Sequence, residues 1–302
     1  MRRTFYTLNI FTDTPFTGNP LAVVVDCEGL AEQRMQTIAR EFNLSETVFV
    51  LDSLDPMNTA RLRIFTPTRE LPFAGHPTIG AAVLIAQLRA PEMLGRAGLG
   101  LALEEPVGPI ACTVRRQKGG AAQASFILPR LPNRLGDAPG KEAIAAALGL
   151  QAADIGFGAH QPSVWSAGNA FTFVPVASLE AIGRALPNRK LFSKTFACSG
   201  SSAYLYTQEV VREGSHVHAR MFGPGMGITE DPATGSAAAA FAGVAAKFER
   251  PDDGDHLLII EQGFEIDRPS IIHLRLQIEG GMLVDASVGG AAVMVSQGTI
   301  EA

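Results

Sequence analysis

The feature that most constrains this chain is an internal repeat. The first half contains, in order, Gly18-Asn19-Pro20, Arg63-Ile64-Phe65-Thr66-Pro67 and Ala74-Gly75-His76. The second half contains, in the same order, Gly168-Asn169-Ala170, Arg220-Met221-Phe222-Gly223-Pro224 and Thr234-Gly235-Ser236. Self-similarity of this kind predicts a duplicated structural unit. The alternative is a chance likeness between short segments rich in glycine and proline.

The segments between these motifs predict mostly strands with a few long helices. Runs rich in β-branched and aromatic residues predict strands at 21–25, 47–51, 61–65, 171–175, 203–207 and 217–222. Apolar periodicity predicts helices at 31–42, 78–88, 141–147, 179–186 and 236–247. Because strands and helices do not alternate as βαβ units, we expect an α+β fold with two similar lobes.

The expected boundary between the lobes is the glycine pair Gly119-Gly120, which lies in a weakly patterned stretch. This gives an N-terminal lobe at 1–118 and a C-terminal lobe at 119–287. The glycine-rich segment that begins at Val288 leads into another strand-like run. We expect this last segment, 288–302, to return to the N-terminal lobe and complete it.

Composition excludes several classes of function. The chain has 302 residues, 46% of them hydrophobic, and a net charge of -5 without a long basic run, so nucleic acid is not an expected partner. The most apolar helical stretch, 79–88, is shorter than the ~20 residues that cross a bilayer. Without a signal peptide at the N-terminus, the expectation is a cytoplasmic protein. The scattered cysteines, Cys27, Cys112 and Cys198, are expected to be buried thiols without disulfides or zinc.

No motif indicates a cofactor or a metal. Gly75 and Gly80 have the spacing of a P-loop, but Ala81 and Ala82 stand where lysine and serine or threonine are required. No glycine-rich segment has the dinucleotide-binding pattern. His216, His218 and Arg220 alternate along an expected strand, which we interpret as a solvated strand face rather than a metal site.

Both repeats place small residues at an expected helix start. A helix N-terminus leaves about four backbone N–H groups unpaired and carries partial positive charge, so it suits a carboxylate. Two such starts, at Gly75-His76 and Thr234-Gly235-Ser236, would bind an anionic substrate if they faced each other across a cleft. The alternative is ordinary capping of the helices by Thr78, Thr234 or Ser236.

Glu46 is the candidate acid–base group. It lies between an expected amphipathic helix and an apolar strand, where apolar neighbours would raise its proton affinity. The alternative is a solvated glutamate at a helix–strand junction. Asp231 precedes the second helix start, as a cap or a substrate ligand, and His76 occupies the matching place in the first half.

Taken together, Pro72-Phe73-Ala74-Gly75-His76-Pro77-Thr78 and Asp231-Pro232-Ala233-Thr234-Gly235-Ser236 resemble motifs of the PhzF family of phenazine biosynthesis. The fold of that family is similar to diaminopimelate epimerase. The resemblance therefore implies two lobes, each a mostly antiparallel sheet around a central helix, with the active site in the cleft between them. It also implies that Glu46 is the general acid/base. It implies active-site roles for His76, Asp231 and Ser236 as well. With Gly75, Gly235 and Thr234 at the expected helix starts, these are the candidate substrate-binding residues.

The same resemblance implies a cofactor-independent isomerase and a homodimer. The characterised member of the family isomerises trans-2,3-dihydro-3-hydroxyanthranilate, so a small carboxylic acid is the expected substrate. Epimerase relatives use two cysteines at the helix starts, but Ala74 and Thr234 stand there in this chain, which excludes that mechanism. Family members often carry proline and histidine after the glycine where this chain has Gly168-Asn169-Ala170-Phe171, which leaves the substrate open. The remaining alternatives are an epimerase-like enzyme on another substrate, a non-catalytic carboxylate-binding protein and an interaction protein.

Overall fold

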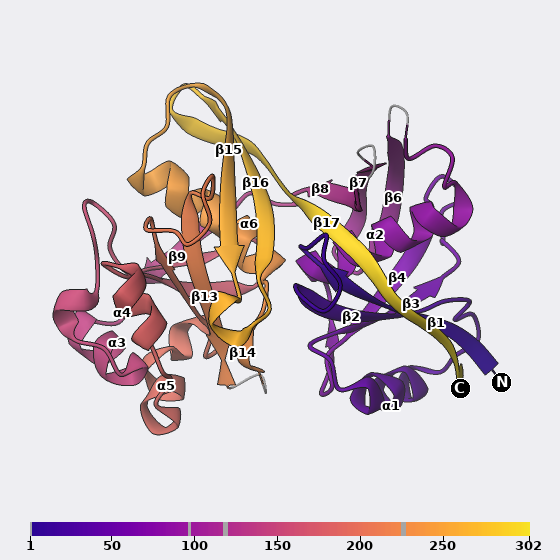
Figure 1. Cartoon of the computed structure of the whole chain (residues 1–302), viewed down its shortest axis with the longest axis horizontal. Helices are drawn as coiled ribbons and strands as arrows, with labels where there is room; N and C mark the ends of the chain where they lie inside the picture. The colour runs from indigo at the N-terminus through magenta and orange to yellow at the C-terminus, as the bar shows by residue number, and fades with distance from the viewer. Residues whose placement is uncertain (1, 96–97, 117–119, 225–227) are drawn as a thin grey trace. The chain divides into compact units, whose positions relative to one another are not determined.

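The chain divides into two compact units in the computed structural model, which describes residues 2–95, 98–116, 120–224 and 228–302. The first unit comprises residues 1–129 and 289–302, and the second comprises residues 130–288 (Figure 1). The break follows the strand at 122–127, rather than the expected glycine pair, because that strand pairs with the one before it. Gly119 itself lies outside the described residues. Residues 289–302 belong to the first unit.

The first unit is a sheet that closes on itself. Its elements are β1 (Arg2–Ile10), β2 (Asn19–Val24), α1 (Glu32–Phe42), β3 (Thr47–Leu51), β4 (Ala60–Phe65), β5 (Glu70–Leu71), α2 (Gly75–Arg89), β6 (Leu99–Glu105), β7 (Gly108–Arg116), β8 (Ala122–Ile127) and the end of β17 (Met282–Glu301). β2 runs parallel to β3 and β4 parallel to β6, whereas β1–β2, β3–β4, β6–β7 and β7–β8 are antiparallel. β17 pairs with both β1 and β8, which completes the ring.

Helix α2 is the core of this ring. It contacts β1, β2, β3, β6, β7 and β8, and every residue from Gly75 to Ala86 is buried. A helix that is apolar on all sides has no solvent face to present, so it suits the centre of a closed sheet. Gly80 lies where an added Cβ would meet Leu21 and Ile10, so its missing side chain gives these strand residues room. Helix α1 instead packs on the outside, with Met35 and Ile38 against Phe49 and Phe65.

The second unit repeats this arrangement with additional helices. Its elements are β9 (Asn133–Asp137), α3 (Lys141–Leu148), η1 (Ala152–Asp154), β10 (Ser163–Ser166), β11 (Ala170–Pro175), α4 (Leu179–Arg184), α5 (Arg189–Thr195), η2 (Ala197–Ser199), β12 (Ala203–Thr207), β13 (Val217–Gly223), β14 (Ile228–Asp231), α6 (Gly235–Phe248), β15 (Gly254–Gln262), η4 (Phe264–Ile266), β16 (Ser270–Glu279) and the start of β17. Helix α6 contacts β9, β10, β11 and β16, and Ala237 to Ala245 are buried.

The strands of the two units pair in the same series of directions. In the first unit the order is β1–β2 antiparallel, β2–β3 parallel, β3–β4 and β4–β5 antiparallel, then α2 and the parallel pair β4–β6. In the second unit β10–β11, β11–β12, β12–β13 and β13–β14 have the same directions, followed by α6 and the parallel pair β13–β15. Chance likeness of short motifs does not reproduce a series of pairings, so the repeat is structural. The α+β class is confirmed as well.

Two expectations about single features have clear outcomes. Cys27 and Cys112 are buried free thiols, but Cys198 is exposed in η2, so the expectation of a buried thiol is wrong there. No helix within the described ranges is long and apolar enough to cross a membrane.

Candidate active site

Glu46 is held at the junction of α1 and β3. Helix α1 ends at Asn43, whose left-handed backbone (φ 50°) donates its N–H to Ala39 O and turns the chain toward β3. The strand that follows, Thr47–Leu51, is buried throughout, so the junction lies against the core of the unit. As a result the Glu46 side chain is only 12% exposed, and the alternative of a solvated junction residue is wrong.

His76 faces Glu46 from the first turn of α2. Its Nε2 lies 3.3 Å from Glu46 Oε2, and its side chain is 5% exposed. Burial lowers the pKa of His76 to about 3, so the ring is neutral at neutral pH. On the other side of the ring, Asn19 Nδ2 lies 3.5 Å from His76 Nδ1. Because an amide nitrogen only donates, this contact favours the tautomer with the proton on Nε2, facing the carboxyl of Glu46.

The start of α2 has no side-chain cap. Ala74 is the N-cap residue, and it carries no group that could cap the first N–H groups. The hydroxyl of Thr78 does not cap them either, because it lies 2.8 Å from Ala74 O and 2.6 Å from Glu105 Oε1. Capping by Thr78 is therefore wrong, and the first N–H groups at Gly75-His76 are not used by a capping side chain.

In the second unit, Asp231 and Thr234 form a buried cluster with Gln262. Thr234 Oγ1 donates to Asp231 Oδ2 at 2.7 Å. The amide of Gln262 donates to Asp231 O at 2.8 Å and to Thr234 Oγ1 at 3.0 Å, and its Oε1 accepts from Thr234 N at 3.1 Å. Thr234 is the N-cap residue of α6, but its hydroxyl bonds to Asp231 rather than to the helix, so capping by Thr234 is also wrong.

The predicted site residues thus form two clusters, one in each unit. Glu46, His76 and Gly75 lie together at the start of α2. The others lie at the start of α6, where Asp231, Thr234 and Gly235 are buried and Ser236 is half-buried. That the two helix starts face each other across one cleft stays a prediction.

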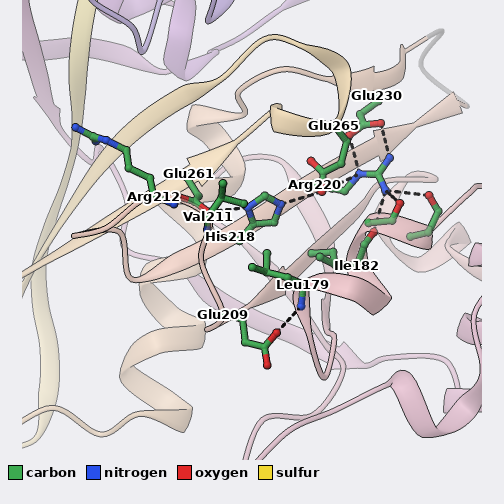
Figure 2. Close-up of polar contacts among 12 residues, drawn as sticks. Leu179, Ile182, Glu209, Val211, Arg212, His218, Arg220, Glu230, Glu261 and Glu265 are labelled. Atoms are coloured by element: carbon green, nitrogen blue, oxygen red, sulfur yellow. Dashed lines mark hydrogen bonds and ion pairs between the residues drawn. The ribbon is translucent and has the colours of Figure 1, made fainter.

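A network of buried charged side chains lies next to Asp231 in the chain (Figure 2). Arg220 binds Glu230 with two hydrogen bonds, of 2.8 and 2.7 Å, and both side chains are less than a tenth exposed. The remaining nitrogen of Arg220 donates to the carbonyls of Ile182, Gly183 and Ala185 at the end of α4. The Arg220–Glu230 pair therefore ties β13 to the residue immediately before Asp231.

His218 extends the network to β15. Its Nδ1 lies 2.8 Å from Glu261 Oε1 and its Nε2 lies 2.9 Å from Glu265 Oε1, as Figure 2 shows. Both ring nitrogens must donate, which requires the charged imidazolium. Burial acts to lower the pKa of His218, but the hydrogen bonds to the two carboxylates raise it to about 9. The expected solvated face is therefore wrong: His218 and Arg220 are buried, and only His216 is exposed.

Three residues of these clusters were not predicted as functional. Asn19 belongs to the repeated glycine–asparagine motif, which was the one signal available for it. Gln262 and Glu105 carry no local signal, because each bonds to residues that are distant in the sequence. Among the described residues, no group of three or more histidine, cysteine or acidic side chains is placed to hold a metal ion.

Comparison with known proteins gives a consistent family. The family model described as phenazine biosynthesis-like protein, PhzC-PhzF, matches residues 8–298. An uncharacterized isomerase of Mesorhizobium japonicum is 48% identical over 303 residues, covering 99% of this chain and 98% of its own length. The trans-2,3-dihydro-3-hydroxyanthranilate isomerase of Pseudomonas aeruginosa is 32% identical over 294 residues, covering 97% of this chain and 98% of its own length.

Solved structures agree with the fold. A phenazine biosynthesis protein of the PhzF family from Bacillus anthracis matches with a TM-score of 0.89 and 28% identity, covering 100% of both chains. A hydroxyproline epimerase from Agrobacterium vitis matches with a TM-score of 0.63 at 12% identity, covering 99% of this chain and 91% of its own. The second likeness concerns the fold alone, and it confirms the expected similarity to the epimerase fold.

Proposed function

Because this chain belongs to the phenazine biosynthesis-like (PhzC-PhzF) family, we propose that it isomerises a small carboxylic acid without a cofactor and that Glu46 moves the proton. The chain is an isomerase, the activity that its curated relatives carry in their names. The observation that carries the proposal is the buried contact between His76 Nε2 and Glu46 Oε2, at the uncapped start of α2.

The proposed step needs one mobile proton and a place for negative charge. The carboxylate of Glu46 takes a proton from a carbon acidified by adjacent unsaturation, and the C–H electron pair moves into the unsaturated system. The carboxylic acid so formed returns the proton to another carbon on the same face, so no oxidant or co-reactant is needed. The backbone N–H groups at the start of α2 would bind the substrate carboxylate during both transfers.

His76 is proposed to orient Glu46 rather than to carry the proton. With a pKa of about 3, the His76 ring is a poor general acid–base group at neutral pH. Its Nε2–H can instead donate to the carboxyl of Glu46 and orient it. Asp231, Thr234, Gly235 and Ser236 are proposed to bind substrate. This assignment rests on their motif, and Asp231 is the candidate acid if Glu46 is not.

The thiol-based mechanism of epimerase relatives finds no support in this chain. Ala74 and Thr234 are the N-cap residues of α2 and α6, the places where thiols would have to stand. Burial, as the largest cause, raises the pKa of both Cys27 and Cys112 to about 12, so neither is a thiolate at neutral pH.

A ligand screen followed by NMR tests the proposal even though the substrate has yet to be identified. Small carboxylic acids, including trans-2,3-dihydro-3-hydroxyanthranilate and cyclic amino acids, are first ranked by thermal shift, since a ligand at 100 times its Kd stabilises a protein by about 2.7 kcal/mol. Each hit is then incubated with the protein in D2O. We expect one hit to convert into an isomer, which carries solvent deuterium to the extent that the protonated Glu46 exchanges with D2O before it returns its proton. Hits that raise Tm but keep unchanged spectra would identify a carboxylate-binding protein instead.

A further inference from the structure

Inside the first unit, the hydroxyl of Thr78 lies within hydrogen-bond distance of two oxygen atoms. A hydroxyl has one hydrogen to donate, yet Thr78 Oγ1 lies 2.8 Å from the carbonyl oxygen of Ala74 and 2.6 Å from Glu105 Oε1. Both distances are hydrogen-bond distances. If the Thr78 hydrogen goes to Ala74, the bond to Glu105 needs a second hydrogen, and only the carboxyl of Glu105 can supply it.

The burial of Glu105 also favours a protonated carboxyl. Glu105 is the last residue of β6, its side chain is among the buried polar groups at 6% exposure, and its Oε2 has no hydrogen-bond partner among the described residues. An ionised carboxylate with an oxygen buried and unpaired is costly, whereas a neutral acid loses much less. Thr78 therefore accepts from a protonated Glu105 and donates to Ala74.

We propose that Glu105 is held as a neutral carboxylic acid and acts as a positioning residue that orders the first turn of α2. The chain of hydrogen bonds runs from the Glu105 O–H to Thr78 Oγ1, and from the Thr78 O–H to the carbonyl of Ala74. Ala74 is the N-cap residue, and His76, which faces Glu46, lies two residues further on. The ordering of the first turn by a neutral Glu105 is argued from these contacts alone. The effect of Glu105 on substrate binding rests on the proposed function.

Ionisation of Glu105 would rearrange the hydrogen bonds between Glu105, Thr78 and Ala74. The Thr78 hydrogen would turn toward the new carboxylate, and Ala74 O would keep only its bond from Thr78 N, at 3.2 Å. A negative charge would also appear below the helix start that is proposed to bind an anionic substrate. Both changes would weaken substrate binding, so the effect belongs in KM more than in kcat.

The surroundings set the pH range of this effect. Burial raises the pKa of Glu105 to about 8, against a smaller lowering by the Thr78 hydrogen bond, and no cationic side chain is among these causes in the described part of the chain. Cys112 on β7 is the other titratable group that interacts with Glu105, and its thiol is neutral because its pKa is about 12. Since the ordinary value for Glu105 is 4.5, its contribution to stability is complete below pH 4.5 and is lost as pH rises through about 8.

The protonation state can be measured directly by infrared spectroscopy. Glu105→Gln keeps a donor for Thr78 and removes the titrating group. The matched control is Glu104→Gln, because Glu104 is only half-buried and its pKa is lowered by hydrogen bonds from Asn58, Leu54 and Asp55. At pH 6.5 we expect a protonated-carboxyl band in wild type and Glu104→Gln that is missing from Glu105→Gln, and at pH 9.5 we expect wild type to lose that band. Identical spectra for wild type and Glu105→Gln at pH 6.5 would overturn the proposal.

Two further readouts test positioning. Amide hydrogen exchange in the first turn of α2, corrected for intrinsic rates, should accelerate between pH 7 and 9.5 in wild type but not in Glu105→Gln. With a substrate, KM should rise at least threefold over the same range in wild type alone. Parallel exchange rates in the two proteins refute the ordering role, and parallel KM profiles refute the link to the site. If no compound turns over, the proposed function fails, while infrared and exchange still decide the state and structural role of Glu105.

Discussion

The starts of α2 and α6 occupy the same place in the two repeats, yet the two units hold buried polar groups of opposite kinds. Around α2, His76 and Glu105 are kept neutral at neutral pH by burial. In the second unit, His218 and Arg220 are cations that are paired with carboxylates, and Arg220 lies on the face of β13 that meets α4. The two units thus share a backbone arrangement and differ in their electrostatics, a difference that fits the proposed proton transfer by Glu46 in the first unit.

The physical consequence is a difference in tolerance to change. A neutral buried group that loses a partner costs the desolvation of one hydrogen bond, whereas a buried ion that loses its partner leaves an uncompensated charge. The second unit should therefore lose more stability than the first when one of these buried groups is substituted. The first should respond mainly to pH.

The largest expected effect is the loss of Arg220. Arg220→Met fills similar volume but leaves Glu230 buried and unpaired, together with the carbonyls at the end of α4. We expect a loss of about 3–5 kcal/mol in the free energy of unfolding, measured by urea denaturation. The matched control, Arg134→Met, breaks a pair with Asp137 whose side chains are 47% and 96% exposed, and should cost about 0–1 kcal/mol. Equal losses in the two variants would contradict the contrast.

A smaller effect is expected from Gln262. Gln262→Leu removes the amide that joins Asp231 O, Thr234 N and Thr234 Oγ1, and each group left unsatisfied costs about 1–3 kcal/mol. Ligand affinity should fall together with stability, because these bonds fix the start of α6. Gln277→Leu on β16 serves as control, since the Gln277 amide donates to the exposed side chain of Glu279. Normal ligand affinity in Gln262→Leu would argue that the α6 start is not part of the binding site.

The smallest effect concerns protonation alone. In nitrogen-15 NMR spectra at pH 7.5, His218 should show two protonated ring nitrogens and His76 one. The pKa of His218 is raised from 6.5 to about 9, so its stabilisation is complete below pH 6.5 and is lost as pH rises through 9. The pKa of His76 is lowered to about 3, so its stabilisation is complete above pH 6.5 and is lost as pH falls toward 3. The same protonation state for both rings at pH 7.5 would remove the contrast.

Local sequence pattern was enough for much of the fold. The strands at Thr47–Leu51 and Ala203–Thr207 match their predicted bounds, because each is a continuous run of strand-forming residues that is buried throughout. Helix α2 begins at Gly75 rather than at residue 78, since proline is tolerated in the first turn of a helix, where Pro77 lies. Helix α5 was not predicted: Arg189–Thr195 has little apolar periodicity, and its start is set by the cap from Asn188.

The site was predictable where motif and chemistry coincide and not where partners are distant in sequence. The side chains of Glu46 and His76, 30 positions apart in the sequence, are in contact, as they must be if both belong to one site. The error over His218 and Arg220 has a simple cause: charged strand residues are usually exposed, and nothing local indicates that Glu261 and Glu230 will pair with them. Pairing of β13 with β14 and β15 decides that burial, and pairing is a property of the whole unit.

The most direct measurement of the central claim is turnover by Glu46→Gln, with the substrate found in the screen. The substitution keeps the shape of the side chain and removes its titrating proton. The account predicts a fall in kcat of at least ~100-fold, with ligand affinity and Tm little changed, because the lost interaction belongs to the transition state. A variant that keeps more than about a tenth of wild-type turnover would contradict the role of Glu46 and move the search for the acid to Asp231.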